Sequence, residues 1–189
     1  MSGVGKKNNV SNVTVEEHAR SSEILVAYLL TETVFKGKKL IVGDGGNKKR
    51  ADINARDNSL AVEVVSCEIP TSRTQSSYYY GIDDITTLFS KELRKKMEKL
   101  NKDNYENSPE NIYLAIDSMI EMSSFVEADI GLEIYKSIAK DYRKRFIDLI
   151  ILNKFGVTMN EHFTQYEFDH RQYVLDLECK LLIDLEKYE

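Results

Sequence analysis

The sequence predicts an α/β fold in which a mixed central β-sheet is flanked by helices on both faces. Three observations lead to this class: apolar residues recur at helical spacing over several long stretches, short β-rich segments lie between them, and only short turns join the first three β-rich segments. Strands joined by short turns pair antiparallel, whereas strands reached through a helix pair parallel. The length of 189 residues fits one domain. We expect it to span residues 13–189, after a polar, flexible tail over residues 1–12.

The first part of the chain predicts one helix and three strands. The helix is expected over residues 15–33, because Thr14 and Glu17 have the spacing of a capping box and apolar residues follow at intervals of three and four. The strands are expected at residues 40–42, 51–55 and 60–67, which are short, apolar and separated by turns rich in glycine, asparagine and aspartate.

The second part predicts helices and strands in alternation. A helix is expected after the polar segment 70–80, because five apolar residues form a stripe at helical spacing: Ile85, Phe89, Leu93, Met97 and Leu100. A strand at 112–116, a helix at 126–145 and a buried strand at 146–152 should follow. A further short strand at 166–168 and a terminal amphipathic helix at 171–188 complete the expectation. That last helix offers a surface for a homodimer.

Composition limits the kinds of partner. The net charge is −5, so binding of nucleic acid must depend on local clusters of lysine and arginine, for which 91–102 and 143–145 are candidates. The alternative is that these clusters are solvated surface. Cys67 and Cys179 lack the spacing of a zinc site or a disulfide framework. No apolar run is long enough to span a bilayer and no secretory signal is recognised, so we expect a cytoplasmic protein with reduced thiols.

Two acidic residues stand in neighbouring predicted strands. Asp52 lies in the second strand and Glu63 in the third, and antiparallel pairing through a tight turn can bring both carboxylates to one side of the sheet. Such a pair suits a hard cation such as Mg²⁺. Glu63 also interrupts an apolar run, where a carboxylate is costly without a partner. The alternative is that Glu63 faces solvent on an edge strand.

The order of elements around these acids resembles the PD-(D/E)XK, or restriction-endonuclease-like, nuclease superfamily. That family shares an αβββαβ core with an aspartate opening the second strand and an acid-X-lysine motif on the third. Asp52 matches the aspartate, with Ala51 where proline is usual, and Glu63 matches the second acid. The resemblance covers roughly residues 15–116. It implies an endonuclease that hydrolyses the phosphodiester bonds of DNA or RNA, with Mg²⁺ or Mn²⁺ held by Asp52, Glu63 and the carbonyl of Val64.

One residue departs from the family pattern. Val65 stands where the lysine is expected. Some members carry this lysine on the following helix, and there Lys96 falls on the same side as the apolar stripe. We therefore expect Lys96 to supply the catalytic cation, the alternative being a surface pair with Glu92. The family's first helix often adds an acidic metal ligand, and Glu23 is the candidate.

The sequence is also compatible with two other functions. A nuclease-like domain without activity would bind nucleic acid or protein without cutting, and Val65 favours it. An unrelated α/β interaction domain would place Asp52 and Glu63 on opposite faces of the sheet. Serine and cysteine hydrolases are not supported, because no GxSxG elbow and no nucleophile with a neighbouring base is present.

Overall fold

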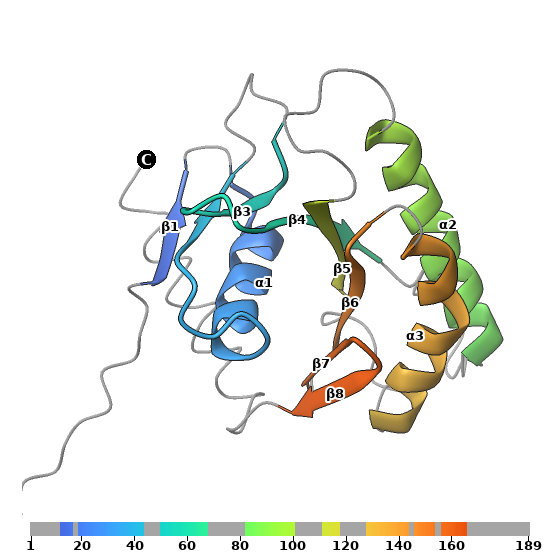
Figure 1. Ribbon diagram of the computed structural model, residues 1–189. Coiled ribbons are helices and arrows are strands. Elements are labelled where there is room, and N and C mark those ends of the chain that lie inside the picture. Colours follow the sequence, from blue (N-terminus) through green and yellow to red (C-terminus); the bar gives the residue numbers. More distant parts are fainter. Residues whose placement is uncertain are drawn as a thin grey trace, which may run out of the picture.

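The computed structural model describes residues 12–16, 19–43, 50–67, 82–100, 111–117, 128–143, 146–153 and 156–165. Within these residues the elements are β1 (Val13–Val15), α1 (Ser21–Glu32), β2 (Leu40–Val42), β3 (Ile53–Ala55), β4 (Ala61–Ser66), α2 (Ile82–Leu100), β5 (Ile112–Asp117), α3 (Ala128–Tyr142), β6 (Asp148–Asn153), β7 (Gly156–Met159) and β8 (His162–Gln165). The strands form one sheet whose spatial order is the order along the chain (Figure 1). The fold is α/β with a mixed sheet, as predicted.

The pairing directions follow the lengths of the connections. β2, β3 and β4 form an antiparallel meander, whereas β4, β5 and β6 are parallel and are joined through α2 and α3. β7 and β8 add an antiparallel hairpin at one edge, and β1 pairs parallel with β2 at the other. The predicted meander and the predicted parallel crossovers are confirmed.

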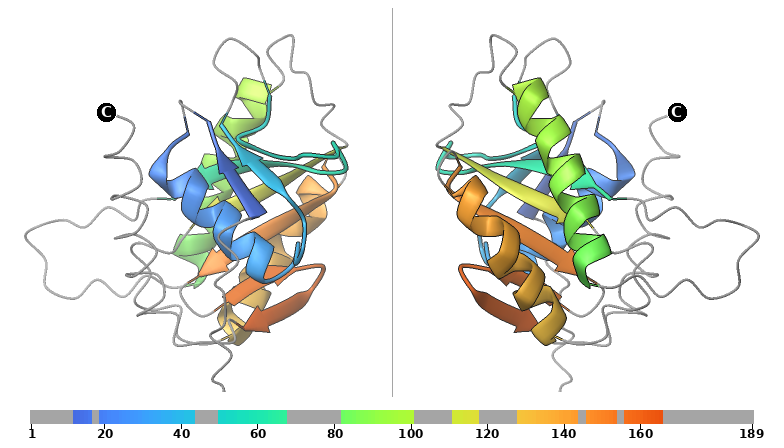
Figure 2. Two further views of the ribbon diagram at one scale, coloured as in Figure 1. Left: turned by 90° about the vertical axis from the view of Figure 1, so that its left-hand side faces the viewer. Right: turned by 90° about the vertical axis from the view of Figure 1, so that its right-hand side faces the viewer.

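Helices cover both faces of the sheet. α1 lies against one face, and α2 and α3 lie side by side against the other (Figure 2). Successive side chains of a strand point to opposite faces. In β4, Val62 and Val64 belong to the apolar cluster under α1, whereas Ala61 and Val65 belong to the cluster under α2 and α3. Glu63 therefore projects towards α2.

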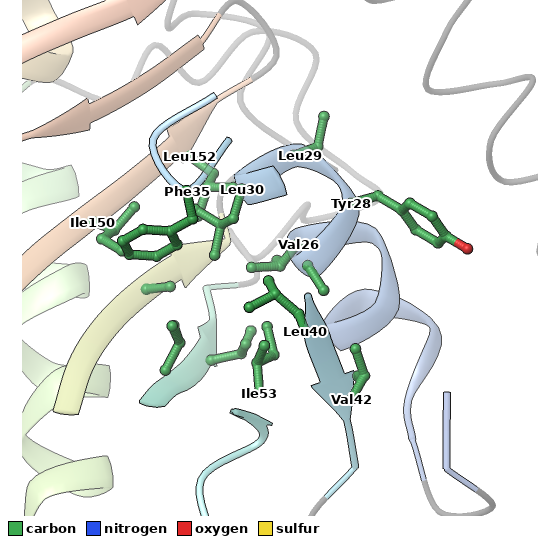
Figure 3. Packing of buried hydrophobic residues seen from close by; sticks show 14 of the residues in the cluster. Val26, Tyr28, Leu29, Leu30, Phe35, Leu40, Val42, Ile53, Ile150 and Leu152 are labelled. Atoms are coloured by element: carbon green, nitrogen blue, oxygen red, sulfur yellow. The ribbon is translucent and has the colours of Figure 1, made fainter. Parts of the chain in front are cut away.

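The apolar cluster under α1 includes side chains from the helix and from the strands of the meander. Leu30, Phe35, Leu40, Ile53 and Ile150 pack together in it (Figure 3). Nearly every residue of α1 is buried, from Glu23 to Thr31. A helix that is apolar on all sides belongs in the interior of a protein, so α1 is part of the core.

The opposite cluster contains the predicted stripe of α2. Ile85, Phe89, Leu93 and Leu100 are buried there, and Met97 packs against its margin. Leu114 and Leu149 are fully buried in the central strands β5 and β6, as expected for parallel strands covered on both faces. Among the described residues, no helix is long and apolar enough to cross a membrane.

The predicted start of the first helix is wrong. Residues 13–15 form β1, and α1 begins at Ser21. The sequence there is Val-Thr-Val, and β-branched residues favour strands over helices. Thr14 is therefore not a helix cap. The cap is formed by Glu23, whose Oε2 accepts a hydrogen bond from the backbone N–H of Arg20 at 3.0 Å.

The sequence predicts no strand between residues 152 and 166, but the chain forms there the hairpin of β7 and β8. Its two turn residues, Asn160 and Glu161, have φ values of 52° and 62°, as two-residue hairpin turns require. Gly156 opens β7 where a Cβ atom would lie 2.3 Å from the carbonyl oxygen of Thr164. Residues 1–11, the predicted strand 166–168 and the predicted helix 171–188 lie outside the described residues.

Candidate functional site

The register of β3 and β4 brings Asp52 and Glu63 together. Ile53 pairs with Val62 and Asn54 with Ala61, so continuing the same register by one residue places Asp52 opposite Glu63. The turn that sets this register is tight. Asp57 Oδ1 accepts a hydrogen bond from the N–H of Ser59 at 3.0 Å, and Asn58 has a φ of 56°, both typical of a short turn. The two carboxyl groups lie on one face of the sheet.

Both acids are buried. Glu63 is 0% exposed and Asp52 is 6% exposed. β4 lies between β3 and β5 and is not an edge strand. The alternative in which Glu63 faces solvent is therefore wrong, and each carboxylate needs a partner that offsets the loss of hydration.

Lys96 of α2 is that partner. Its Nζ lies 2.9 Å from Asp52 Oδ2, forms an ion pair with Glu63 Oε2 and donates a hydrogen bond to the carbonyl of Val64 at 3.3 Å. The alternative pair with Glu92 is not formed, because Lys95 takes that place at 2.6 Å. Lys96 therefore lies on the side of α2 that the apolar stripe predicted.

The backbone of Val64 contributes two polar groups to the same place. Its N–H donates to Asp52 Oδ2 at 2.8 Å, and its carbonyl accepts from Lys96. The pairing of β3 with β4 ends at Ile53, so neither group has a strand partner there. Buried backbone groups require hydrogen bonds, and the side chains of Asp52 and Lys96 provide them.

The pKa values of the two carboxyl groups are shifted in opposite directions. Burial and the negative charge of Asp52 raise the pKa of Glu63 to about 8, against the opposing charge of Lys96. Burial also acts on Asp52, but the charge of Lys96 and the hydrogen bonds that Asp52 accepts hold its pKa below the ordinary value. The pKa of Lys96 is raised because its two acidic partners outweigh its own burial. Groups whose pKa values are pushed apart in this way occur often at active sites.

Glu23 is not brought into this cluster. It is buried in the first turn of α1, where Arg20 binds it through the backbone N–H and through Nε at 3.2 Å. Burial raises its pKa, and the charge of Asp52 adds to the effect. Within the described part of the chain, no three histidine, cysteine, aspartate or glutamate side chains are placed to hold one metal ion. The oxygen donors that do converge come from Asp52, Glu63 and Val64.

The chemical type of these oxygen donors suits a hard divalent cation. Carboxylate and carbonyl oxygens are the ligands that Mg²⁺ and Mn²⁺ prefer. Glu63 Oε1 is buried and has no hydrogen-bond donor among the described residues, which leaves one carboxyl oxygen available to an ion. Val65, where the sequence resemblance implies a lysine, is packed in the apolar cluster under α2 and α3. Among the described residues, Lys96 is the cation that contacts both acids.

A salt bridge next to the site joins the residue after β1 to the segment that precedes Asp52. Arg50 Nη2 contacts both carboxylate oxygens of Glu16, at 3.2 and 3.1 Å. Glu16 follows β1, and Arg50 stands two residues before Asp52. Gly43, after β2, has a φ of 129°, and a Cβ atom there would lie 2.8 Å from Glu16 Cβ. Glycine at this position therefore leaves room for the salt bridge that holds the approach to Asp52.

Sequence reasoning did not single out Asp148, a further buried carboxylate. Asp148, at the start of β6, accepts hydrogen bonds from Tyr135 at 2.6 Å, Arg143 at 2.8 Å and the N–H of Asn160 at 2.8 Å. Its signal in the sequence was the one used for Glu63, a carboxylate in a predicted buried strand. All its donors come from the chain itself, so Asp148 ties α3 and the β7–β8 hairpin to β6.

Comparisons with protein families, curated proteins and solved structures found no match for this chain.

Proposed function

We propose that this protein is a metal-dependent nuclease of the PD-(D/E)XK type that hydrolyses phosphodiester bonds of DNA or RNA with Mg²⁺ or Mn²⁺. The observation that supports this proposal is the convergence of Asp52, Glu63 and the Val64 carbonyl with the ammonium group of Lys96. The order α1, β2, β3, β4, α2, β5 agrees with the αβββαβ core of that family.

Each residue has a role in this proposal. Asp52, Glu63 and the Val64 carbonyl would hold the ion, whose chemistry is to polarise a phosphodiester and to lower the pKa of a water molecule. Lys96 supplies the positive charge that the family places at the position of Val65, and it orients the water or pairs with the phosphate. Glu23, expected as a further ligand, instead positions the start of α1 through Arg20.

Local positive charge for a nucleic acid is present on α2. Its outer side has a hollow of about 380 Å³ lined by Thr86, Thr87, Ser90, Lys91, Arg94, Lys95 and Glu98. None of the site residues lines this hollow, so we assign it no part in the chemistry. Lys91, Arg94 and Lys95 are exposed, and such side chains are typical contacts to a phosphate backbone.

The test is cleavage of labelled double-stranded DNA, single-stranded DNA and RNA with Mg²⁺ or Mn²⁺. Wild type should cut at least one substrate, and Glu63→Gln, which keeps the size of the side chain but removes its charge, should lose at least about a hundredfold in rate. Glu161→Gln is the matched control at an exposed glutamate and should cut like wild type. Cleavage that survives Glu63→Gln in full would remove Glu63 from the chemistry and overturn the proposal.

A second candidate is a nuclease-like domain that binds nucleic acid or protein without cutting it. The observation that favours it is the ion cluster itself, because Lys96 already provides a cationic partner for both acids. Calorimetry separates the two functions. Absence of Mn²⁺ binding, together with retained binding of nucleic acid by wild type and by Glu63→Gln, would favour the binding domain.

A further inference from the structure

We infer that the ammonium group of Lys96 occupies the position of the divalent ion in the metal-free protein, so that Lys96 must leave this position before the ion can bind. This inference rests on the proposed function and concerns the regulation of the same site. Lys96 Nζ contacts Asp52 Oδ2, Glu63 Oε2 and the carbonyl of Val64. These three residues are the ones that would hold the ion.

The oxygen atoms of the site suit one cation, and a second cation bound there would be repelled by the first. An ammonium group has three hydrogens to donate, and its three oxygen partners here match that number. Both acids face this one ammonium group, and Lys96 is only 14% exposed. A divalent ion bound by the same oxygens would stand next to the ammonium group, where like charges repel with little screening by water.

Lys96 has a way out of the cluster. It stands on α2 beside Lys95, whose side chain is largely exposed, and lysine has a long flexible stem that can carry its charge to the surface. After release the ammonium group remains at the rim of the site, where the phosphodiester anion of a substrate would pair with it. Ion and substrate would then favour the same position of Lys96.

The gain in affinity for the ion depends on the fraction of molecules in which Lys96 fills the position of the ion. The apparent dissociation constant of the ion rises in inverse proportion to the fraction of molecules in which the position is open. The three contacts of Lys96 and its burial favour the filled position. If the position is open in about a tenth of the molecules or fewer, removal of the ammonium group tightens binding of the ion by about tenfold or more.

The experiment is calorimetric titration of Mn²⁺ into the full chain for wild type, Lys96→Met and Lys95→Met. Methionine keeps an unbranched apolar stem and removes the charge. Lys95→Met removes one positive charge from the next position of the helix without touching Asp52 or Glu63, so it measures the general effect of charge. Lys96→Met should bind Mn²⁺ about tenfold or more tightly than wild type, and Lys95→Met within about twofold of wild type.

The other outcomes separate the inference from the function. If wild type binds Mn²⁺ and Lys96→Met binds it no more tightly, the inference fails and the proposed nuclease stands. If Lys95→Met gains as much as Lys96→Met, the gain is general electrostatics and the inference fails. If neither wild type nor Lys96→Met binds Mn²⁺ at millimolar concentration, both the inference and the proposed function fail.

A second measurement uses wild type alone and does not depend on the folding of a variant. An amine-acylating reagent is applied with and without saturating Mn²⁺, and modification of Lys96 is compared with that of Lys95 by mass spectrometry. Displacement of Lys96 should raise its labelling at least about threefold while that of Lys95 stays constant. Unchanged labelling of Lys96 while calorimetry records ion binding overturns the inference.

Discussion

Lys96 Nζ lies 2.9 Å from Asp52 Oδ2, although 44 residues separate them along the chain. This contact joins α2 to the residue that precedes β3, and it completes a cluster with the fully buried Glu63. The cluster therefore has a structural role in the metal-free protein whatever its chemistry, and this role can be measured by itself.

Lys96→Met should lower the free energy of unfolding by about 3–5 kcal/mol in metal-free buffer, because it leaves two buried carboxyl groups without their cation. Lys95→Met should change it by less than about 1 kcal/mol, since the Lys95–Glu92 pair is on the surface. Urea unfolding at pH 7 with a chelator measures both. Equal stabilities of the two variants would contradict the assigned contacts of Lys96.

Glu63 should make stability depend on pH. Its pKa is raised from 4.5 to about 8 in the folded protein by burial and by Asp52, so between these values the folded state binds more protons than the unfolded state. The free energy of unfolding should then fall as pH rises from about 5 to about 8, with a slope approaching about 1.4 kcal/mol per pH unit from this group.

Glu63→Gln isolates that contribution. Asp52, with a lowered pKa, and Lys96, with a raised pKa, stay charged across this window. The difference in unfolding free energy between wild type and Glu63→Gln, followed by urea titration at several pH values without metal, should therefore decrease steadily from pH 5 to pH 8. A difference that does not vary with pH would show that Glu63 is ionised throughout.

Cys67 should be inert towards thiol reagents. Burial, with the negative charges of Glu92 and Asp117, raises its pKa to about 12, and the thiolate is the reactive species. In a Cys179→Ser background, Cys67 should react with a disulfide reagent at pH 8 at least about a hundredfold more slowly in the native protein than in guanidinium. Comparable rates before and after unfolding would place Cys67 in an accessible position.

Asp148 should be a determinant of stability and not of metal binding. Asp148→Ala removes the acceptor for Tyr135, Arg143 and the N–H of Asn160, and it should cost about 3 kcal/mol or more, because the buried hydroxyl of Tyr135 and the partly buried guanidinium of Arg143 both lose their acceptor. Glu161→Ala, at the exposed end of the same group, should cost less than about 1 kcal/mol. Unfolding experiments rank the two, and a reversed ranking would contradict the burial of Asp148.

The sequence predicted those parts of the fold that depend on periodicity. The stripe from Ile85 to Leu100 fixed both the existence of α2 and the side of the helix on which Lys96 lies. The short turn 56–59 fixed the register that brings Asp52 to Glu63. These relationships are local or follow from the regular geometry of an element, so they can be read without the tertiary structure.

Other parts of the fold were not predicted, because the same sequence pattern is compatible with two different structures or because no pattern specifies the contact. Thr14 and Glu17 have the spacing of a helix cap, but the same residues sit in and after a β-branched segment that pairs with β2. The turn of the β7–β8 hairpin is Asn160-Glu161 and lacks the glycine that usually marks such turns. Tyr135 and Asp148 meet because α3 packs on β6, and no spacing in the sequence specifies that packing.

The sheet also has a consequence for the way the chain is made. Because every strand pairs with its neighbour in the sequence, a nascent chain can extend the sheet one strand at a time as it leaves the ribosome, without waiting for a distant partner. β3 and β4 precede α2 in the chain, so Asp52 and Glu63 leave the ribosome before Lys96 does. During that interval the growing domain carries an uncompensated pair of acids, and α2 neutralises them when it docks.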